Sequence, residues 1–66
     1  MNTNHYVVEI DIDDFKEIGD GEARGLIRLL RRSREDGGDV RLRVTREDLK
    51  HSLRIMALDR LFAIES

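Results

Sequence analysis

Apolar and polar residues alternate along two short stretches of the chain. In residues 6–12, one face collects four apolar side chains and the other is mostly acidic: Tyr6, Val8, Ile10 and Ile12 lie opposite Val7, Glu9, Asp11 and Asp13. In residues 40–44, Val40, Leu42 and Val44 lie opposite Arg41 and Arg43. A period of two is typical of a strand that buries one face. We therefore predict two strands with charged outer faces, on which Glu9 and Asp11 lie near Arg41 and Arg43 if the strands are neighbours.

A helical period separates these strands, over about residues 21–36. Its apolar stripe is Ala23, Leu26, Ile27, Leu30 and Ser33, widened by Leu29. Asp20 is predicted as the N-cap, and Glu22 suits the positive end of the helix dipole. The pair Gly37-Gly38 ends the helix, because glycine accepts the left-handed conformation of a C-terminal cap. Gly25 costs about 1 kcal/mol relative to Ala inside a helix, which suggests a close contact there.

A second helix and a third strand are predicted to follow. The helix covers about residues 46–57, and Thr45 with Asp48 resembles a capping box at its start. The inward stripe of this helix is Leu49, Leu53, Met56 and Ala57, with Ile55 and Leu58 at its margins. Residues 61–64 are short and mainly apolar, as in a strand.

The order strand, helix, strand, helix, strand implies parallel strands joined by right-handed crossovers. Because the first two strands have polar outer faces, both helices should cover the same side of the sheet. The predicted fold class is therefore α/β, with a three-stranded parallel sheet in the order 1-2-3 and two helices on one face. The length of 66 residues leaves room for one domain, residues 1–66.

Composition narrows the function classes further. The chain has no Cys and two His, which argues against a disulfide framework and a thiolate metal site. Its net charge of −2, with 39% charged residues, argues against a general nucleic-acid binder. No apolar run is long enough to cross a membrane, and residues 1–4 lack the features of a signal peptide. We expect a cytoplasmic protein that binds no membrane and no nucleic acid.

Five acidic residues before and at the first helix form one candidate site: Asp11, Asp13, Asp14, Asp20 and Glu22. They suit either a metal or a basic partner, but EF-hand spacing is absent, and a solvated loop is the favoured interpretation. The segment 19–21 lacks the Lys and the Ser or Thr of a phosphate-binding P-loop.

Two further sets of residues carry alternative functions. The arginines at 24, 28, 31, 32 and 34 suit either a nucleic-acid stripe or a solvated helix face. The solvated face is favoured, since no aromatic residue lies between them and Glu35 and Asp36 follow. His51 and Ser52 are neighbours, but adjacent helical residues point apart, which argues against a hydrolase triad. We expect no enzymatic activity, no cofactor and no metal.

Three segments together resemble the STAS domain, the fold of bacterial anti-sigma-factor antagonists. Residues 8–15 are similar to the family's central strand, which typically reads vvlDlsgv-f. Residues 26–38, LIRLLRRSREDGG, resemble its helix and Gly-Gly exit, and residues 58–64, LDRLFAI, its closing GLDRLFPI pattern. The resemblance covers about residues 6–65 and lies in the order and spacing of these segments.

The chain departs from the family in two respects. The family carries two strands and a helix before the strand that begins here. It also carries a D-S-S/T-G motif whose second hydroxyl residue is phosphorylated, whereas this chain has Gly19-Asp20-Gly21-Glu22 at that place. Aligning Ile18 with the family's apolar residue puts Gly21 at the phosphoacceptor position and Asp20 before it, and neither residue is a substrate for a serine kinase.

The resemblance implies a protein-interaction module that binds an anti-sigma-factor-like protein without a phosphorylation switch. The partner-binding residues it implies are Asp14, Gly19, Asp20, Gly21, Glu22, Arg24 and Arg28. The rival hypothesis is a minimal or engineered α/β structural protein, or a fragment, that only associates with itself. A homodimer is expected in either case, through the open sheet edge at residues 6–12 or through exposed helix flanks near Leu29 and Ile55.

Overall fold

The computed structural model describes residues 5–66 and contains three strands and two α-helices. In chain order the elements are β1 (Val7–Asp11), the 3-10 helix η1 (Ile12–Asp14), α1 (Asp20–Glu35), β2 (Asp39–Arg43), α2 (Glu47–Ile55), the 3-10 helix η2 (Leu58–Arg60) and β3 (Ala63–Glu65). The prediction that residues 1–4 carry no signal peptide lies outside the described residues. No α-helix within residues 5–66 is long and apolar enough to cross a bilayer.

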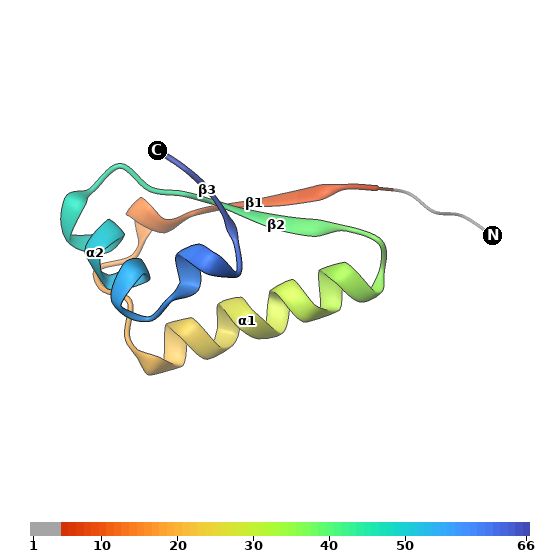
Figure 1. Cartoon of the computed structure of the whole chain (residues 1–66), viewed down its shortest axis with the longest axis horizontal. Helices are drawn as coiled ribbons and strands as arrows, with labels where there is room; N and C mark the ends of the chain where they lie inside the picture. Colours follow the sequence, from red (N-terminus) through yellow and green to blue (C-terminus); the bar gives the residue numbers. More distant parts are fainter. Residues whose placement is uncertain (1–4) are drawn as a thin grey trace.

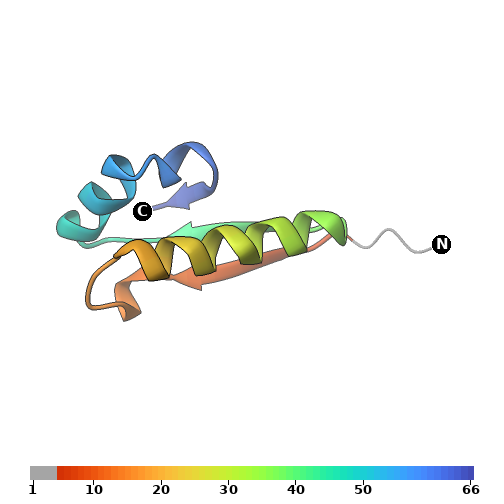
Figure 2. The same cartoon turned by 90° about the horizontal axis from the view of Figure 1, so that it is seen from below.

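The sheet is parallel throughout, with the strand order β1-β2-β3. Both helices lie on the same side of it (Figure 1). In the view turned by 90°, α1 runs along β1 and β2, while α2 lies toward β3 (Figure 2). The predicted fold class, a three-stranded parallel sheet in the order 1-2-3 with both helices on one face, is confirmed.

Residues of opposite charge are cross-strand neighbours on the outer face of the sheet. The register places Glu9 opposite Arg41 and Asp11 opposite Arg43, as the alternation predicted. Arg43 also lies opposite Glu65 of β3. Within residues 5–66, no ion pair within 4.0 Å joins these neighbours. Exposed charges at this separation contribute little to stability, so they favour the register more than they drive folding.

The core fills the space between the sheet and the helices. Its buried side chains come from β2, both helices and the connecting segments: Ile12, Ile18, Leu26, Leu30, Val40, Leu42, Val44, Leu49, Leu53, Leu58 and Phe62. The inward stripe predicted for α1 is confirmed, since Leu26, Leu30 and Ser33 are buried. In α2 the prediction is wrong at its C-terminal end. Ala57 is exposed and Leu58 is buried, because the helix stops at Ile55 and the chain turns.

The C-terminus of α1 shows why the Gly-Gly pair is there. Gly37 has φ 89°, and its N–H donates to the Arg34 carbonyl while the Gly38 N–H donates to the Ser33 carbonyl at 2.7 Å. These two bonds are those of a Schellman motif, which satisfies the last carbonyls of a helix. A Cβ at Gly38 would stand 2.5 Å from Cε1 of Tyr6. Gly38 therefore allows the Tyr6 ring to pack directly on the turn.

Gly25 behaves differently from the prediction. A Cβ at Gly25 would meet nothing within 4 Å, so no close contact explains this glycine. The residue is exposed, on the part of α1 that faces away from the sheet. The prediction of a close contact at Gly25 is therefore wrong.

Candidate functional site

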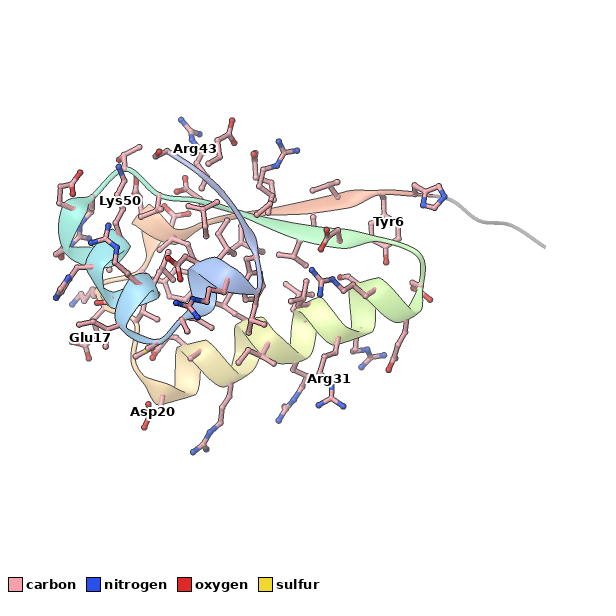
Figure 3. All side chains as sticks on the ribbon, in the orientation of Figure 1. Tyr6, Glu17, Asp20, Arg31, Arg43 and Lys50 are labelled. Carbon is pink, nitrogen blue, oxygen red and sulfur yellow. The ribbon has the colours of Figure 1, made fainter. Side chains whose placement is uncertain are left out.

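The predicted site residues lie where β1 leads into α1, beyond the carboxyl end of β1. Asp14 ends η1, Gly19 precedes α1, and the other five lie in the first nine residues of that helix: Asp20, Gly21, Glu22, Arg24 and Arg28. All except Gly19 are exposed. Figure 3 shows Asp20 at the N-terminal end of α1, pointing away from the sheet. We call these seven residues the helix-start surface.

The first turn of α1 is capped by Glu22. Gly19, with φ −102° and ψ −170°, occupies the N-cap position, and its N–H donates to Oε1 of Glu22 at 2.9 Å. The prediction of Asp20 as the N-cap is therefore wrong, since Asp20 is the first helical residue. Its carboxylate lies in the first turn, where the positive end of the helix dipole favours negative charge.

The two residues aligned with the phosphoacceptor segment, Asp20 and Gly21, are exposed and lie in the first turn of α1. A Cβ at Gly21 would meet nothing within 4 Å. Within residues 5–66, the Asp20 carboxylate takes part in no ion pair and no hydrogen bond. A substitution at either position changes the surface of the protein without disturbing its packing.

A clamp made by Asp13 holds the preceding loop in place. The Asp13 carboxylate accepts hydrogen bonds from Oγ1 of Thr45 at 2.6 Å, from the Thr45 N–H at 3.0 Å and from the Arg46 N–H at 3.2 Å. These bonds, from the Thr45 hydroxyl above all, hold the pKa of Asp13 below its ordinary value of 3.8. The prediction that Asp13 lies with Asp11 on the outer strand face is wrong, because β1 ends at Asp11.

The strand ends there because Asp11 turns the backbone. Oδ1 of Asp11 accepts the Asp13 N–H at 3.1 Å, which starts η1 and directs Asp13 toward the β2–α2 connection. The Asp13 clamp then joins residues that are 32 and 33 positions apart in sequence. It fixes the loop before α1 against the end of β2.

Arg46 adds a second tie to this loop. Its guanidinium donates to the Phe15 carbonyl at 3.2 Å and forms an ion pair with Asp48 at 2.7 Å. The hydrogen bond from Arg46 lowers the pKa of Asp48. The predicted capping box of Thr45 and Asp48 is wrong, because Arg46 occupies the N-cap position and the Thr45 hydroxyl donates to Asp13.

The acidic loop is thus divided between structural and exposed carboxylates. Asp11, Asp13 and Glu22 each accept backbone N–H groups, while Asp14 and Asp20 remain at the surface. Among residues 5–66, no three His, Asp or Glu side chains lie together in a way that suits a metal ion.

Arg24 and Arg28 lie further along α1 and line a shallow groove of about 230 Å³. The groove is completed by Ile27 and Arg31. The sequence had indicated arginines on this face but not the apolar side chain between them. Arg34 has a different role from its neighbours, because it pairs with Asp39 at 3.3 Å and donates to the Leu61 carbonyl at 3.1 Å.

A second groove, of about 520 Å³, lies between α2 and β3 and was not predicted from the sequence. Its lining combines apolar and charged side chains: Val44, Lys50, Leu53, Arg54, Asp59, Ile64 and Ser66. It does not include any residue of the helix-start surface. His51 is exposed, and Ser52 donates to the Asp48 carbonyl at 3.2 Å within its own helix.

No family model, curated protein or solved structure matches this chain.

Proposed function

We propose that this chain is a non-enzymatic protein-interaction module resembling a STAS anti-sigma-factor antagonist, and that it binds its partner through the helix-start surface. The observation that carries the proposal is the backbone at Ala57. This residue has φ 58° and ψ 22°, and it stands where the family's closing GLDRLFPI pattern has its first glycine. The left-handed region is the one that favours glycine. Ala57 therefore has a backbone conformation that glycine favours at the place where the quoted pattern has glycine, which supports the resemblance.

The Gly-Gly exit gives a second point of agreement with the resemblance. Gly37 has φ 89°, so the segment LIRLLRRSREDGG ends in the turn that its glycines allow. Both left-handed residues lie at positions where the quoted family patterns carry glycine. Agreement at two separate turns supports the resemblance more strongly than amphipathic helices do, because such helices occur in many folds.

The helix-start surface suits a constitutive interaction. The Asp13 clamp and Arg46 hold the loop before α1, so the surface is ordered before a partner arrives, and binding costs little conformational entropy. Gly21 has no hydroxyl group at the position aligned with the phosphoacceptor. Ser33 is buried, and the Ser52 hydroxyl already donates within α2. We therefore propose that partner binding does not depend on phosphorylation.

The test is capture of a partner by the tagged chain from an extract of its source cells, followed by mass spectrometry. Asp20→Ser removes an exposed charge from the helix-start surface, and Asp59→Ser removes one from η2 as the matched control. The proposal expects Asp20→Ser alone to change the amount of partner retained. Equal retention by both variants contradicts it. Phosphate incorporated into Ser33 or Ser52 by a cognate kinase, with release of the partner, contradicts the absence of a switch.

The second candidate function is self-association without another partner. Its supporting observation is that β1 is an edge strand, which presents a row of unpaired backbone groups. Val7, on β1, is 53% exposed and favours such pairing. Glu9 and Asp11 oppose it, because pairing two copies of β1 would bring like charges together. Sedimentation velocity at micromolar concentration should then show a dimer that dissociates on dilution, with a matching loss of stability. A monomer whose stability is independent of concentration rejects this candidate.

A further inference from the structure

Four arginines lie along the side of α1 that faces away from the sheet. Arg24, Arg28, Arg31 and Arg32 are all exposed, and Arg28 lies three or four residues from each of the other three. Arg28 lies about 200° around the helix from both Leu26 and Leu30, two buried residues of the inward stripe. Figure 3 shows Arg31 pointing away from the sheet. We call these four residues the arginine stripe.

Arg28 is at the centre of this stripe, and its charged neighbours at helical spacing are all arginines. The residues four before it, three after it and four after it are Arg24, Arg31 and Arg32. Like charges at these spacings destabilise a helix. Within residues 5–66, none of the four guanidinium groups forms an ion pair or a hydrogen bond, whereas Arg34 and Arg46 form both. Within the described residues, no carboxylate is therefore bonded to the stripe.

An apolar side chain lies beside these charges. Arg24, Arg28 and Arg31 form the groove of about 230 Å³ together with Ile27, which is half-buried and packs against the core. A groove lined by one apolar and three cationic side chains fits a ligand that has an apolar side chain next to carboxylates. Arginine is suited to this role because its planar guanidinium binds a carboxylate through two parallel hydrogen bonds.

Acidic residues at both ends limit the length of the stripe. Asp20 lies four residues before Arg24, and Glu35 lies four residues after Arg31. At 1.5 Å per helical residue, the cations from Arg24 to Arg31 span about 10 Å. A nucleic-acid strand that followed the stripe would continue onto Asp20 or Glu35, which repel phosphate. Three carboxylates on successive turns of a partner helix cover the same length of about 10 Å.

We propose that the arginine stripe and Ile27 bind an acidic amphipathic helix of a partner protein. Three carboxylates of that helix pair with Arg24, Arg28 and Arg31, and an apolar side chain beside them enters the groove over Ile27. This inference rests on the proposed function, because Arg24 and Arg28 belong to the helix-start surface. It adds the chemistry of the partner, which the resemblance does not provide.

The experiment uses the full chain and a fluorescein-labelled helical peptide that carries Glu at positions i, i+4 and i+7, one neighbouring Leu, and Lys at both ends. A charge-reversed peptide, with Lys at the three central positions and Glu at the ends, is the ligand control. Fluorescence anisotropy is measured at about 0.02 M and about 0.15 M NaCl, since added salt screens exposed charges. The acidic peptide should bind, with an affinity that falls as salt rises, and the charge-reversed peptide should not bind.

Arg28→Glu is the decisive variant. It should weaken binding of the acidic peptide by at least about tenfold, and it should raise the melting temperature, because it replaces three repulsive neighbours with attractive ones. Arg28→Gln should weaken binding to a smaller extent. Arg54→Gln removes an exposed arginine from α2 and should leave binding unchanged.

Equal affinity of the wild type and Arg28→Glu overturns the inference, as does an absence of binding at low salt. Tighter binding of a single-stranded oligonucleotide than of the acidic peptide also overturns it and identifies a nucleic-acid surface. If the wild type self-associates but does not bind the peptide, and Arg28→Glu abolishes the self-association, then a second copy of the chain binds the arginine stripe. This result also overturns the inference. The proposed function has a separate test in Asp20→Ser. If that substitution reduces partner capture while the acidic peptide fails to bind, the proposed function is supported and only the acidic-helix inference is rejected.

Discussion

Replacing Ala57 with glycine should stabilise the protein. Ala57 has φ 58° and ψ 22°, in the left-handed region where Cβ approaches the following carbonyl oxygen. This conformation costs an L-residue with a side chain about 1–2 kcal/mol. Ala57 is exposed, so removal of its methyl group takes little apolar area out of the core.

The expected gain is smaller than the full cost of the left-handed conformation. Glycine also gives the unfolded chain more freedom, which lowers stability by about 0.4–1 kcal/mol. The net effect of Ala57→Gly should be an increase of about 0.5–1 kcal/mol in the free energy of unfolding. In a domain of this size, that corresponds to a rise of several degrees in the melting temperature.

Urea titration followed by circular dichroism measures this change, with Ala23→Gly as the control. Ala23 lies inside α1, where glycine should cost about 1 kcal/mol. The two substitutions are identical in chemistry and should have opposite signs. If Ala57→Gly destabilises the protein as Ala23→Gly does, then α2 continues through residue 57 and the left-handed turn is absent.

Two further predictions concern local packing and pH. Gly25→Ala should stabilise the protein by about 1 kcal/mol, since a Cβ there meets nothing within 4 Å. Gly38→Ala should destabilise the protein, because its Cβ would stand 2.5 Å from the Tyr6 ring. Thermal melts of both variants test these two predictions. The Asp13 carboxylate has a lowered pKa, so its stabilising effect is present above its ordinary value of 3.8 and is lost as pH falls through the folded-state pKa. Asp13→Asn should therefore reduce the loss of stability on acidification, and an unchanged pH dependence in urea titrations would contradict the Asp13 clamp.

The alternation of side chains was sufficient to predict the sheet. Val40, Leu42 and Val44 are fully buried, and the Arg residues between them face outward as expected. The parallel arrangement was predictable from the order of the elements. A helix between two strands is the usual crossover that joins parallel neighbours, and such crossovers are almost always right-handed. These features depend on local periodicity, which is visible in the chain itself.

The contacts that hold the candidate site depend on tertiary structure instead. Asp13 and Thr45 meet across 32 residues, and nothing in either segment signals the pairing. The cap of α1 was assigned to Asp20 because Asp is a favoured N-cap residue, but the Glu22 carboxylate three residues after Gly19 was the more informative signal. Ala57 was assigned to the inward stripe of a helix because it continues the helical spacing of Leu49 and Leu53, but the helix stops at Ile55 and the turn buries Leu58 instead.

The central claim is that the helix-start surface binds a partner protein. Its most direct test is the dissociation constant of the captured partner, measured by isothermal titration calorimetry with Gly21→Arg and with Ile55→Arg. Gly21 is exposed and has open space around it, and Ile55 is 69% exposed on α2, so each variant adds the same charge without disturbing the core. We predict that Gly21→Arg changes the affinity by at least about tenfold, without lowering the melting temperature, and that Ile55→Arg binds as the wild type does. Equal affinities of the two variants and the wild type would contradict the claim.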